Sequence, residues 1–205
     1  MSNALIVFVK NWETGNVKTR IAQDIGTAAA SAIYQKLLLH TYHIIQPLNS
    51  DIYIYYADAI SSTDQWEKDR YIKRLQQNTD LGSRMFTAFE EVFQDKHDKV
   101  CIIGSDCLQL STDTLKQAFE LLDQYDIVIG PAVDGGYYLL GMKEQVRPVF
   151  SSINWSTNQV FDQTIQLIKK HSYSFALLTQ LADIDTVHEV PEDWITELRK
   201  KGYME

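Results

Sequence analysis

Short apolar runs alternate with longer segments of helical periodicity along this chain, and that alternation limits the fold more than any other feature. The runs have the length and composition of strands buried in a parallel sheet, and they occupy residues 4–9, 51–57, 100–104, 126–131 and 173–178. A further apolar run, at residues 137–141, directly follows a pair of glycines. The helical segments occupy residues 27–46, 81–93, 111–124, 157–170 and 191–200. Alternating strands and helices predict an α/β protein.

Neither the length of the chain nor its pattern calls for a second domain. With 205 residues, of which 45% are hydrophobic, the chain can enclose a core and a ligand cleft. No internal repeat and no Pro-, Gly- or Ser-rich linker interrupts the order of elements. The sequence therefore predicts one domain over residues 1–205.

Helix-start signals support the predicted helices. Asp80 precedes a helical segment as a candidate N-cap, and Ser156 with Gln159 makes a candidate capping box. Pro191 is well suited to the first turn of the last predicted helix.

The overall charge excludes some classes of partner. A formal net charge of −8 and a pI near 5.1 argue against nucleic acid or an anionic membrane surface as the main partner. The apolar run at residues 4–9 is too short to span a bilayer and lacks the flanks of a signal peptide. Cys101 and Cys107 are expected to be reduced thiols. These features predict a cytoplasmic protein without a membrane span.

Basic residues follow the first predicted strand in an unusual place. Lys10 stands at the strand end, and Lys18, Thr19 and Arg20 open a helix just beyond it. Free N–H groups at a helix start already favour anions, and two added cations strengthen that preference. The segment therefore predicts an anion site at the carboxyl edge of the sheet, where open α/β sheets bind ligands. A solvated basic loop is the alternative.

Four aspartates also follow predicted strand ends. Asp106, Asp134, Asp183 and Asp185 are far apart in sequence, but a parallel sheet would bring them to one edge. Each alone is typical of a turn or a helix cap. Together, beside a phosphate-directed basic segment, hard oxygen ligands predict a Mg²⁺ or Mn²⁺ site that serves a nucleotide.

Two glycines follow Asp134. Gly135 and Gly136 allow positive φ and a close approach of the backbone to a ligand, although a plain tight turn would explain them equally well.

Four segments carry a resemblance over nearly the whole chain. LIVFVKNWETGNVKTRIAQDIG, CIIGSDCLQLS, DIVIGPAVDGGYYLLG and LADIDTVHEVPEDW resemble the ordered motifs of the DUF2064 family of glycosyltransferase-like proteins. The resemblance implies the nucleotide-diphospho-sugar transferase (GT-A, Rossmann-like) fold. In this fold a single three-layer α/β/α domain contains a mostly parallel mixed sheet.

The resemblance also implies roles for individual residues. The side chains that would hold nucleotide phosphates are Lys18 and Arg20, with help from Lys10. Asp106 would bind a divalent metal, and Asp185 or the neighbouring Asp183 would supply a second ligand. The loop that reads the base in related folds matches residues 76–85, which makes Gln77, Asp80 and Gly82 candidates.

Three functions remain open from the sequence. The first is transfer of a sugar from a nucleotide-diphosphate donor to an unknown small-molecule acceptor, with Asp134 as the general base and His188 as a distant second candidate. The second is nucleotidyl transfer, as in guanylyltransferases, with release of pyrophosphate. The third is a nucleotide-binding module without catalysis.

Overall fold

Seven strands form one sheet in the computed structural model, which describes residues 2–14, 16–67 and 69–204. In chain order the strands are β1 (Asn3–Val9), β2 (Asp51–Tyr56), β3 (Tyr71–Leu75), β4 (Lys99–Ile103), β5 (Ile127–Pro131), β6 (Tyr137–Met142) and β7 (Phe175–Leu177). Their spatial order is β3-β2-β1-β4-β6-β5-β7. Every pairing is parallel except those of β6, which runs antiparallel between β4 and β5. The expected α/β fold with a mostly parallel mixed sheet is therefore confirmed.

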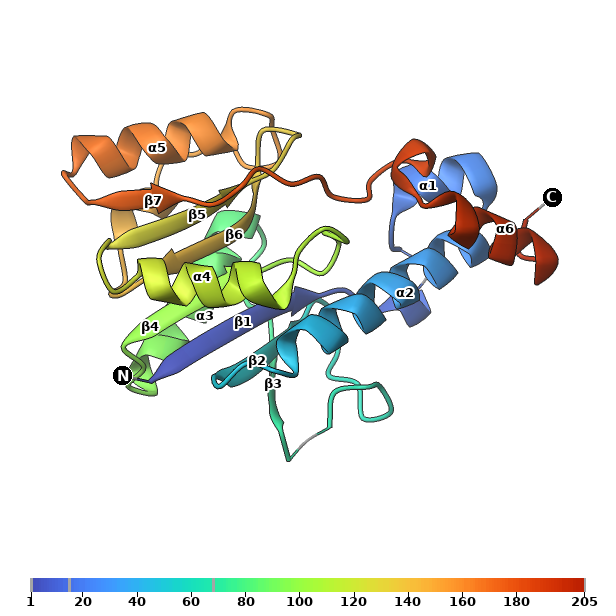
Figure 1. Ribbon diagram of the computed structural model, residues 1–205, viewed down its shortest axis with the longest axis horizontal. Helices are drawn as coiled ribbons and strands as arrows, with labels where there is room; N and C mark the ends of the chain where they lie inside the picture. Colours follow the sequence, from blue (N-terminus) through green and yellow to red (C-terminus); the bar gives the residue numbers. More distant parts are fainter. Residues whose placement is uncertain (1, 15, 68, 205) are drawn as a thin grey trace.

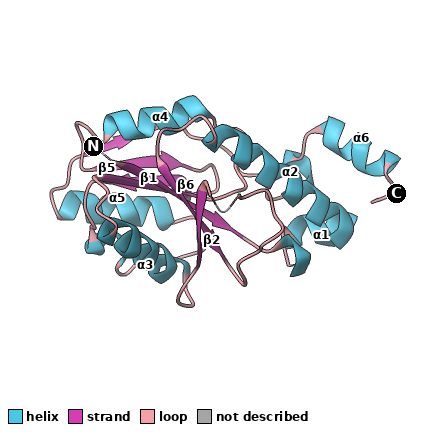
Figure 2. Cartoon of the chain, turned by 90° about the horizontal axis from the view of Figure 1, so that it is seen from below, coloured by secondary structure: helices cyan, strands magenta, loops and turns pink. Residues whose placement is uncertain are grey.

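Helices cover both faces of this sheet. They are α1 (Thr19–Ile25), α2 (Thr27–Ile45), α3 (Leu81–Gln94), α4 (Thr112–Leu121), α5 (Val160–Lys170) and α6 (Glu192–Lys200). Three short 3₁₀ turns are η1 (Trp12–Thr14), η2 (Arg147–Phe150) and η3 (Val187–Glu189). In Figures 1 and 2, α2 and α4 lie on one face of the sheet, and α3 and α5 lie on the other. The molecule thus has three layers.

The side chains of each strand alternate between the two faces and fill two separate core clusters. On β1, Leu5 and Val7 belong to the cluster under α2 and α4, whereas Ala4 and Ile6 belong to the cluster under α3 and α5. All four are fully buried. Because both faces are buried, β1 is a continuous apolar run in the sequence rather than an alternating one.

The carboxyl end of the sheet is extended by three helices. Figure 1 shows α1, α6 and the N-terminal end of α2 beyond the sheet. A long connecting segment leads from β7 to α6, whereas α1 and α2 follow β1. Gly26 separates α1 from α2 because its φ of 90° is outside the helical range, and its N–H still caps α1 through the carbonyl of Ala22. No helix in the described residues is both long enough and apolar enough to cross a membrane.

Several local predictions differ from the structure, including the end of α4, which comes at Leu121, three residues earlier than predicted. Strand β3 was not predicted, because this edge strand carries Lys73 and Arg74 and lacks an apolar run. Helix α5 begins at Val160, three residues later than predicted. The predicted capping box of Ser156 and Gln159 is wrong, since Ser156 has a left-handed φ of 62° and the helix has no side-chain cap.

Other local predictions hold. Asp80 caps α3 by accepting a hydrogen bond from the N–H of Ser83 at 2.9 Å. Cys101 and Cys107 are both free and buried, as expected for reduced thiols.

Candidate active site

The carboxyl edge of the sheet brings together two segments that are far apart in the sequence. The turn after β4 carries Asp106, and the segment that follows β7 carries Asp183 and Asp185. A hydrogen bond of 3.0 Å from the N–H of Ile184 to the carbonyl oxygen of Asp106 joins the two segments. The Sγ of Cys107 also contacts the carbonyl oxygen of Ala182 at 3.6 Å. The backbone therefore fixes the spacing of these carboxylates.

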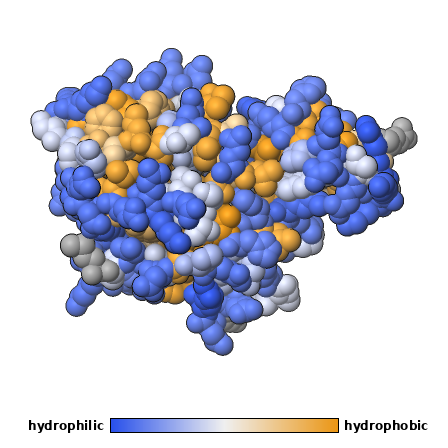
Figure 3. All heavy atoms as spheres, viewed as in Figure 1, coloured by the Kyte–Doolittle hydropathy of each residue, from blue (hydrophilic) through white to orange (hydrophobic). Residues whose placement is uncertain are grey.

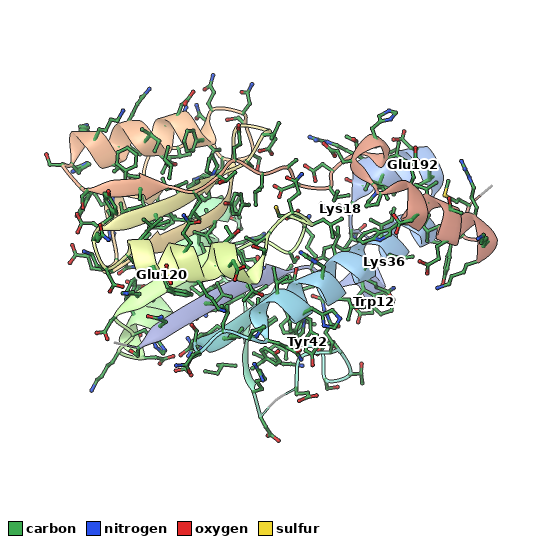
Figure 4. All side chains as sticks on the ribbon, viewed as in Figure 1. Trp12, Lys18, Lys36, Tyr42, Glu120 and Glu192 are labelled. Carbon is green, nitrogen blue, oxygen red and sulfur yellow. The ribbon has the colours of Figure 1, made fainter. Side chains whose placement is uncertain are left out.

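Lys18 links the two segments through its side chain. Its Nζ donates to Asp106 Oδ2 and to Asp185 Oδ1, both at 3.0 Å. In Figure 4, Lys18 lies where the connecting segment crosses from the sheet to α1. Burial of the ammonium lowers its pKa, but the two carboxylates outweigh that effect, so the pKa of Lys18 is raised. Lys18 is therefore charged and holds the two aspartates together.

Asp183 is the most perturbed carboxylate of this site. Burial and then the negative charge of Asp106 raise the pKa of Asp183 to about 7, and Asp134 and Asp185 add to the rise. Its Oδ1 is buried without a hydrogen-bond partner. A buried oxygen of this kind has unused capacity to bind a cation.

Asp185 is positioned by a capping box that sequence reasoning missed. The side chain of Glu189 accepts from the N–H of Asp185 at 2.7 Å and from the N–H of Thr186 at 2.6 Å. Thr186 caps η3 in return. The signal was present, since Thr186 and Glu189 have the spacing of a capping box. His188, the second candidate for a base, is exposed on the same 3₁₀ turn.

The carboxylates offer the hard oxygen donors that Mg²⁺ and Mn²⁺ prefer. Asp106 and Asp185 converge on one point, and Asp183 adds an oxygen with no partner. At that point, however, Lys18 is the cation. In the described part of the chain, no group of three or more His, Cys, Asp or Glu side chains is arranged to hold a metal. The donor set thus fits a divalent cation by its chemistry, provided that the Lys18 ammonium moves away.

Asp134 lies on the turn between β5 and β6. Its Oδ1 accepts from the N–H of Gly136 at 2.9 Å, and the residue is otherwise exposed. Gly135 has a φ of 89°, and a Cβ there would lie 2.2 Å from the backbone oxygen of Asn158. Its own carbonyl accepts from the N–H of Phe161 at 2.9 Å. The turn is therefore held tightly against the start of α5, with an exposed carboxylate close enough to affect the pKa of Asp183.

The basic residues differ in how they are held. Arg20 is 74% exposed and its Nη1 lies 3.9 Å from Asp185 Oδ2, so it can turn toward a ligand. Thr19 is exposed at the start of α1, and Lys10 is exposed just after β1. Together with Lys18 they line the basic side of the carboxyl edge.

Tyr34 of α2 is a site residue that the sequence did not reveal. Its hydroxyl accepts from the N–H of Lys10 and shares a second hydrogen bond with Ser105, both at 2.8 Å. Burial raises the pKa of Tyr34 to about 12, so the hydroxyl is neutral. Tyr34 ties the end of β1 to the turn that carries Asp106. A tyrosine on the apolar face of a predicted helix was the only signal, and it is not specific.

The predicted base-reading residues lie on the loop after β3 and the start of α3. The Nε2 of Gln77 donates to Glu91 at 2.9 Å, and Asp80 caps α3. Gly82 faces the indole of Trp155, where a Cβ would lie 2.1 Å from the ring nitrogen. Within the described part of the chain, these three residues contact α3 and Trp155, and none of them bonds to Lys18 or to the carboxylates that it holds.

A separate cavity lies away from these residues. It has a volume of about 450 Å³ and lies between η1, α2 and α6, with Trp12, Lys36 and Tyr203 in its walls. Figure 4 labels Trp12 and Lys36 on this side of α2. None of the predicted site residues lines it.

Comparisons with known proteins support the fold and show the family. Residues 41–157 match DUF2064, a family described as uncharacterized proteins conserved in bacteria. A candidate nucleotide-diphospho-sugar transferase from Desulfovibrio desulfuricans G20 is 31% identical, with a TM-score of 0.83 over 91% of this chain and 84% of that chain.

Two more distant structures share the fold alone. The inositol-1-phosphate CTP transferase from T. maritima is 14% identical, with a TM-score of 0.61 over 98% of this chain and 96% of that one. Rv0371c from Mycobacterium tuberculosis H37Rv, solved in complex with manganese, is 12% identical, with a TM-score of 0.57 over 92% and 96%. With the family match over more than half of its length, the chain belongs to the DUF2064 family.

Proposed function

We propose that this protein is a metal-dependent transferase that moves a sugar from a nucleotide-diphosphate donor to a small-molecule acceptor. The observation that carries the proposal is the cluster of Asp106, Asp183 and Asp185 beside Lys18 at the carboxyl edge of the sheet. A transferase that binds a nucleotide is also what the names of the relatives support.

The carboxylates would hold Mg²⁺ or Mn²⁺. Asp106 and Asp185 would supply the converging oxygens, and Asp183 would supply the oxygen that has no partner. A divalent cation held there would neutralise the charge that develops on the leaving diphosphate. The Mn²⁺ complex of Rv0371c, which has the same fold, favours this choice of ion.

The basic residues and the glycine turn would bind and orient the donor. Arg20 offers a planar fork to phosphate oxygens, and Lys18 and Lys10 offer point charges. Gly135 and Gly136 let the backbone approach the donor closely. The residues assigned to base recognition are Gln77, Asp80 and Gly82.

Asp134 would act as the general base. Its carboxylate is exposed and, among the described residues, accepts one hydrogen bond, from the N–H of Gly136, so it can accept the proton of an acceptor hydroxyl that attacks with inversion.

Nucleotidyl transfer is the second candidate. The fold shared with a CTP transferase favours it, and the same basic residues and Asp106 would serve. In that reaction a phosphorylated acceptor attacks the α-phosphate of a nucleoside triphosphate, and pyrophosphate leaves.

Isothermal titration with UDP, GDP, UTP, GTP and CTP, each with Mn²⁺ and again with excess EDTA, tests the proposal. Metal-dependent binding of a diphosphate that is lost in Asp106→Asn supports sugar transfer. Tight binding of a triphosphate with weak binding of the diphosphate favours nucleotidyl transfer. Binding that is unaffected by EDTA and by Asp106→Asn would indicate a nucleotide-binding module. Glu120→Gln is the matched control, because it removes an exposed carboxylate from α4 (Figure 4).

A further inference from the structure

A cation that belongs to the protein occupies the point where two of the proposed metal ligands converge. The Lys18 ammonium lies 3.0 Å from an oxygen of Asp106 and 3.0 Å from an oxygen of Asp185, and its side chain is only 6% exposed. A buried lysine that bridges two carboxylates from distant segments is held in a fixed position, unlike a lysine in a solvated surface ion pair.

The backbone at Lys18 is also unusual. Its φ of 46° and ψ of 52° are in the left-handed region, which is uncommon for a residue with a Cβ. It stands between Val17, which is anchored in the core, and the first turn of α1. The chain therefore adopts a disfavoured conformation at the position that brings this ammonium between the aspartates.

Lys18 alone does not satisfy all the carboxyl oxygens of the cluster. It bonds to one oxygen of Asp106 and one of Asp185, whereas Asp183 keeps one buried oxygen without a partner. Arg20 is the next cation, but it is 74% exposed and lies 3.9 Å from Asp185. One ammonium thus satisfies two of the three acids, and the cluster has capacity for a cation of higher charge.

We propose that Lys18 is an exchangeable counter-ion that holds the metal ligands in place until a divalent cation replaces its ammonium. The inference rests on the proposed function and adds a second role to Lys18. On exchange, the flexible four-carbon stem lets the ammonium leave the two carboxylates and turn toward the phosphates of the donor. Metal binding and phosphate binding are then coupled through one side chain, because the charge that leaves the metal site joins the phosphate site.

Binding of Mn²⁺ without nucleotide tests this role in the full chain. Lys18→Met removes the competing charge and keeps a side chain of similar length. The expected result is tighter Mn²⁺ binding than in the wild type, by on the order of tenfold, because the ion no longer displaces a bound cation. Lys18→Arg keeps the charge and is expected to bind Mn²⁺ as weakly as the wild type. A purely structural Lys18 gives the opposite sign, since its loss would disorder the aspartates and weaken Mn²⁺ binding in Lys18→Met.

A second measurement uses the wild-type protein and so does not depend on a variant that folds. Acylation of Lys18 by acetic anhydride, followed by peptide mass spectrometry, is expected to be slow in metal-free protein and to rise several-fold with saturating Mn²⁺. Lys36, which pairs with Glu197 at 2.5 Å on the far side of α2, is the internal control and should not respond.

The outcomes separate this inference from the proposed function. Wild-type protein that binds nucleotide with Mn²⁺, combined with unchanged or weaker Mn²⁺ binding in Lys18→Met, overturns the exchange role and leaves the transferase proposal standing. Constant Lys18 acylation at saturating Mn²⁺ also overturns it. Absence of both metal and nucleotide binding in the wild type and in Lys18→Met overturns both proposals.

Discussion

Asp134 has one observed contact and one proposed catalytic role, and a single substitution can separate the two. Its Oδ1 holds the turn by accepting from the N–H of Gly136, whereas the proposed base function needs a carboxylate that can take a proton. An amide oxygen can perform the first task and not the second. Asparagine is therefore the informative replacement at this position.

We expect Asp134→Asn to keep the fold and the affinity for the nucleotide but to lower turnover by about 10²-fold or more. The measurement is steady-state kinetics with the donor that the binding titrations identify, together with a thermal melt. Full turnover by Asp134→Asn would exclude Asp134 as the base and would direct attention to His188.

Gly82 packs so closely against the indole of Trp155 that no space is left for a Cβ at position 82. Gly82→Ala would place a Cβ 2.1 Å from the indole nitrogen, so we expect a loss of about 1–3 kcal/mol in the free energy of unfolding. Urea denaturation measures this loss. The double variant Gly82→Ala with Trp155→Ala should lose less than the sum of the single variants, because the clash disappears. Strict additivity would contradict the contact.

Asp134 and Gly82 differ in how much of their environment the sequence can predict. Asp134 follows a strand end and stands before two glycines, so its location at the carboxyl edge could be predicted. The contact of Gly82 with Trp155 joins segments 73 residues apart and depends on how the start of α3 packs against the loop before α5, for which the sequence has no periodic signal. Lys18 is an intermediate case, since its place at the edge was predictable but its pairing with Asp106 and Asp185 was not.

At the scale of elements, the edge strands of the sheet are less buried than its central strands, and apolar runs predict them less well. The central strand β1 is a continuous apolar run and was predicted. Edge strand β3 has only one buried residue, Tyr71. Because the strand also carries Lys73 and Arg74, it contains no apolar run that would predict a strand. Strand β7, at the other edge, keeps Leu177 49% exposed, and Figure 3 shows apolar atoms at the surface there. Strand prediction from apolar runs is therefore strongest where both faces are covered.

Strand β3 is anchored by a buried ion pair. Lys73 Nζ lies 2.6 Å from Asp64 Oδ1, with side-chain exposures of 7% and 8%, and Tyr56 also donates to Asp64. We expect Asp64→Ala to lower the free energy of unfolding by about 3–5 kcal/mol, because Lys73 would be left buried and unpaired. Urea denaturation tests this. Replacing both partners, with Asp64→Leu and Lys73→Met, should cost clearly less, and an equal loss in the double variant would argue against the pair.

Helix α6 is held to α2 by charges that respond to pH. Hydrogen bonds from Lys201 and Lys36 lower the pKa of Glu197 to about 2. A carboxyl with a lowered pKa in the folded state stabilises fully above its unfolded value, near 4.5, and the stabilisation disappears as the pH falls through about 2. We expect Glu197→Gln to melt at a lower temperature than the wild type at pH 7, with the difference shrinking progressively below pH 4.5. A difference that stays constant down to pH 3 would contradict the assignment.

At the scale of the whole molecule, the sheet order decides where the chemistry lies. Six parallel strands end at one edge, so Lys10, Asp106 and Asp183 reach the same region although they belong to three different strand ends. That convergence follows from topology and was predictable once the alternation of elements was recognised. The extension formed by α1, α6 and the end of α2, with its cavity of about 450 Å³, was not predictable, because a helix pattern does not specify which neighbour the helix packs against.

The bond between Lys18 and Asp185 closes a loop of 167 residues. Contacts between such distant positions have a high entropic cost of closure and form late during folding, after local helices and neighbouring strands have assembled. A partly folded chain can therefore possess most of its sheet and still lack the cluster that Lys18 joins. The acidic cluster comes together only when the early and late parts of the chain meet, so we expect it to assemble after most of the sheet has formed.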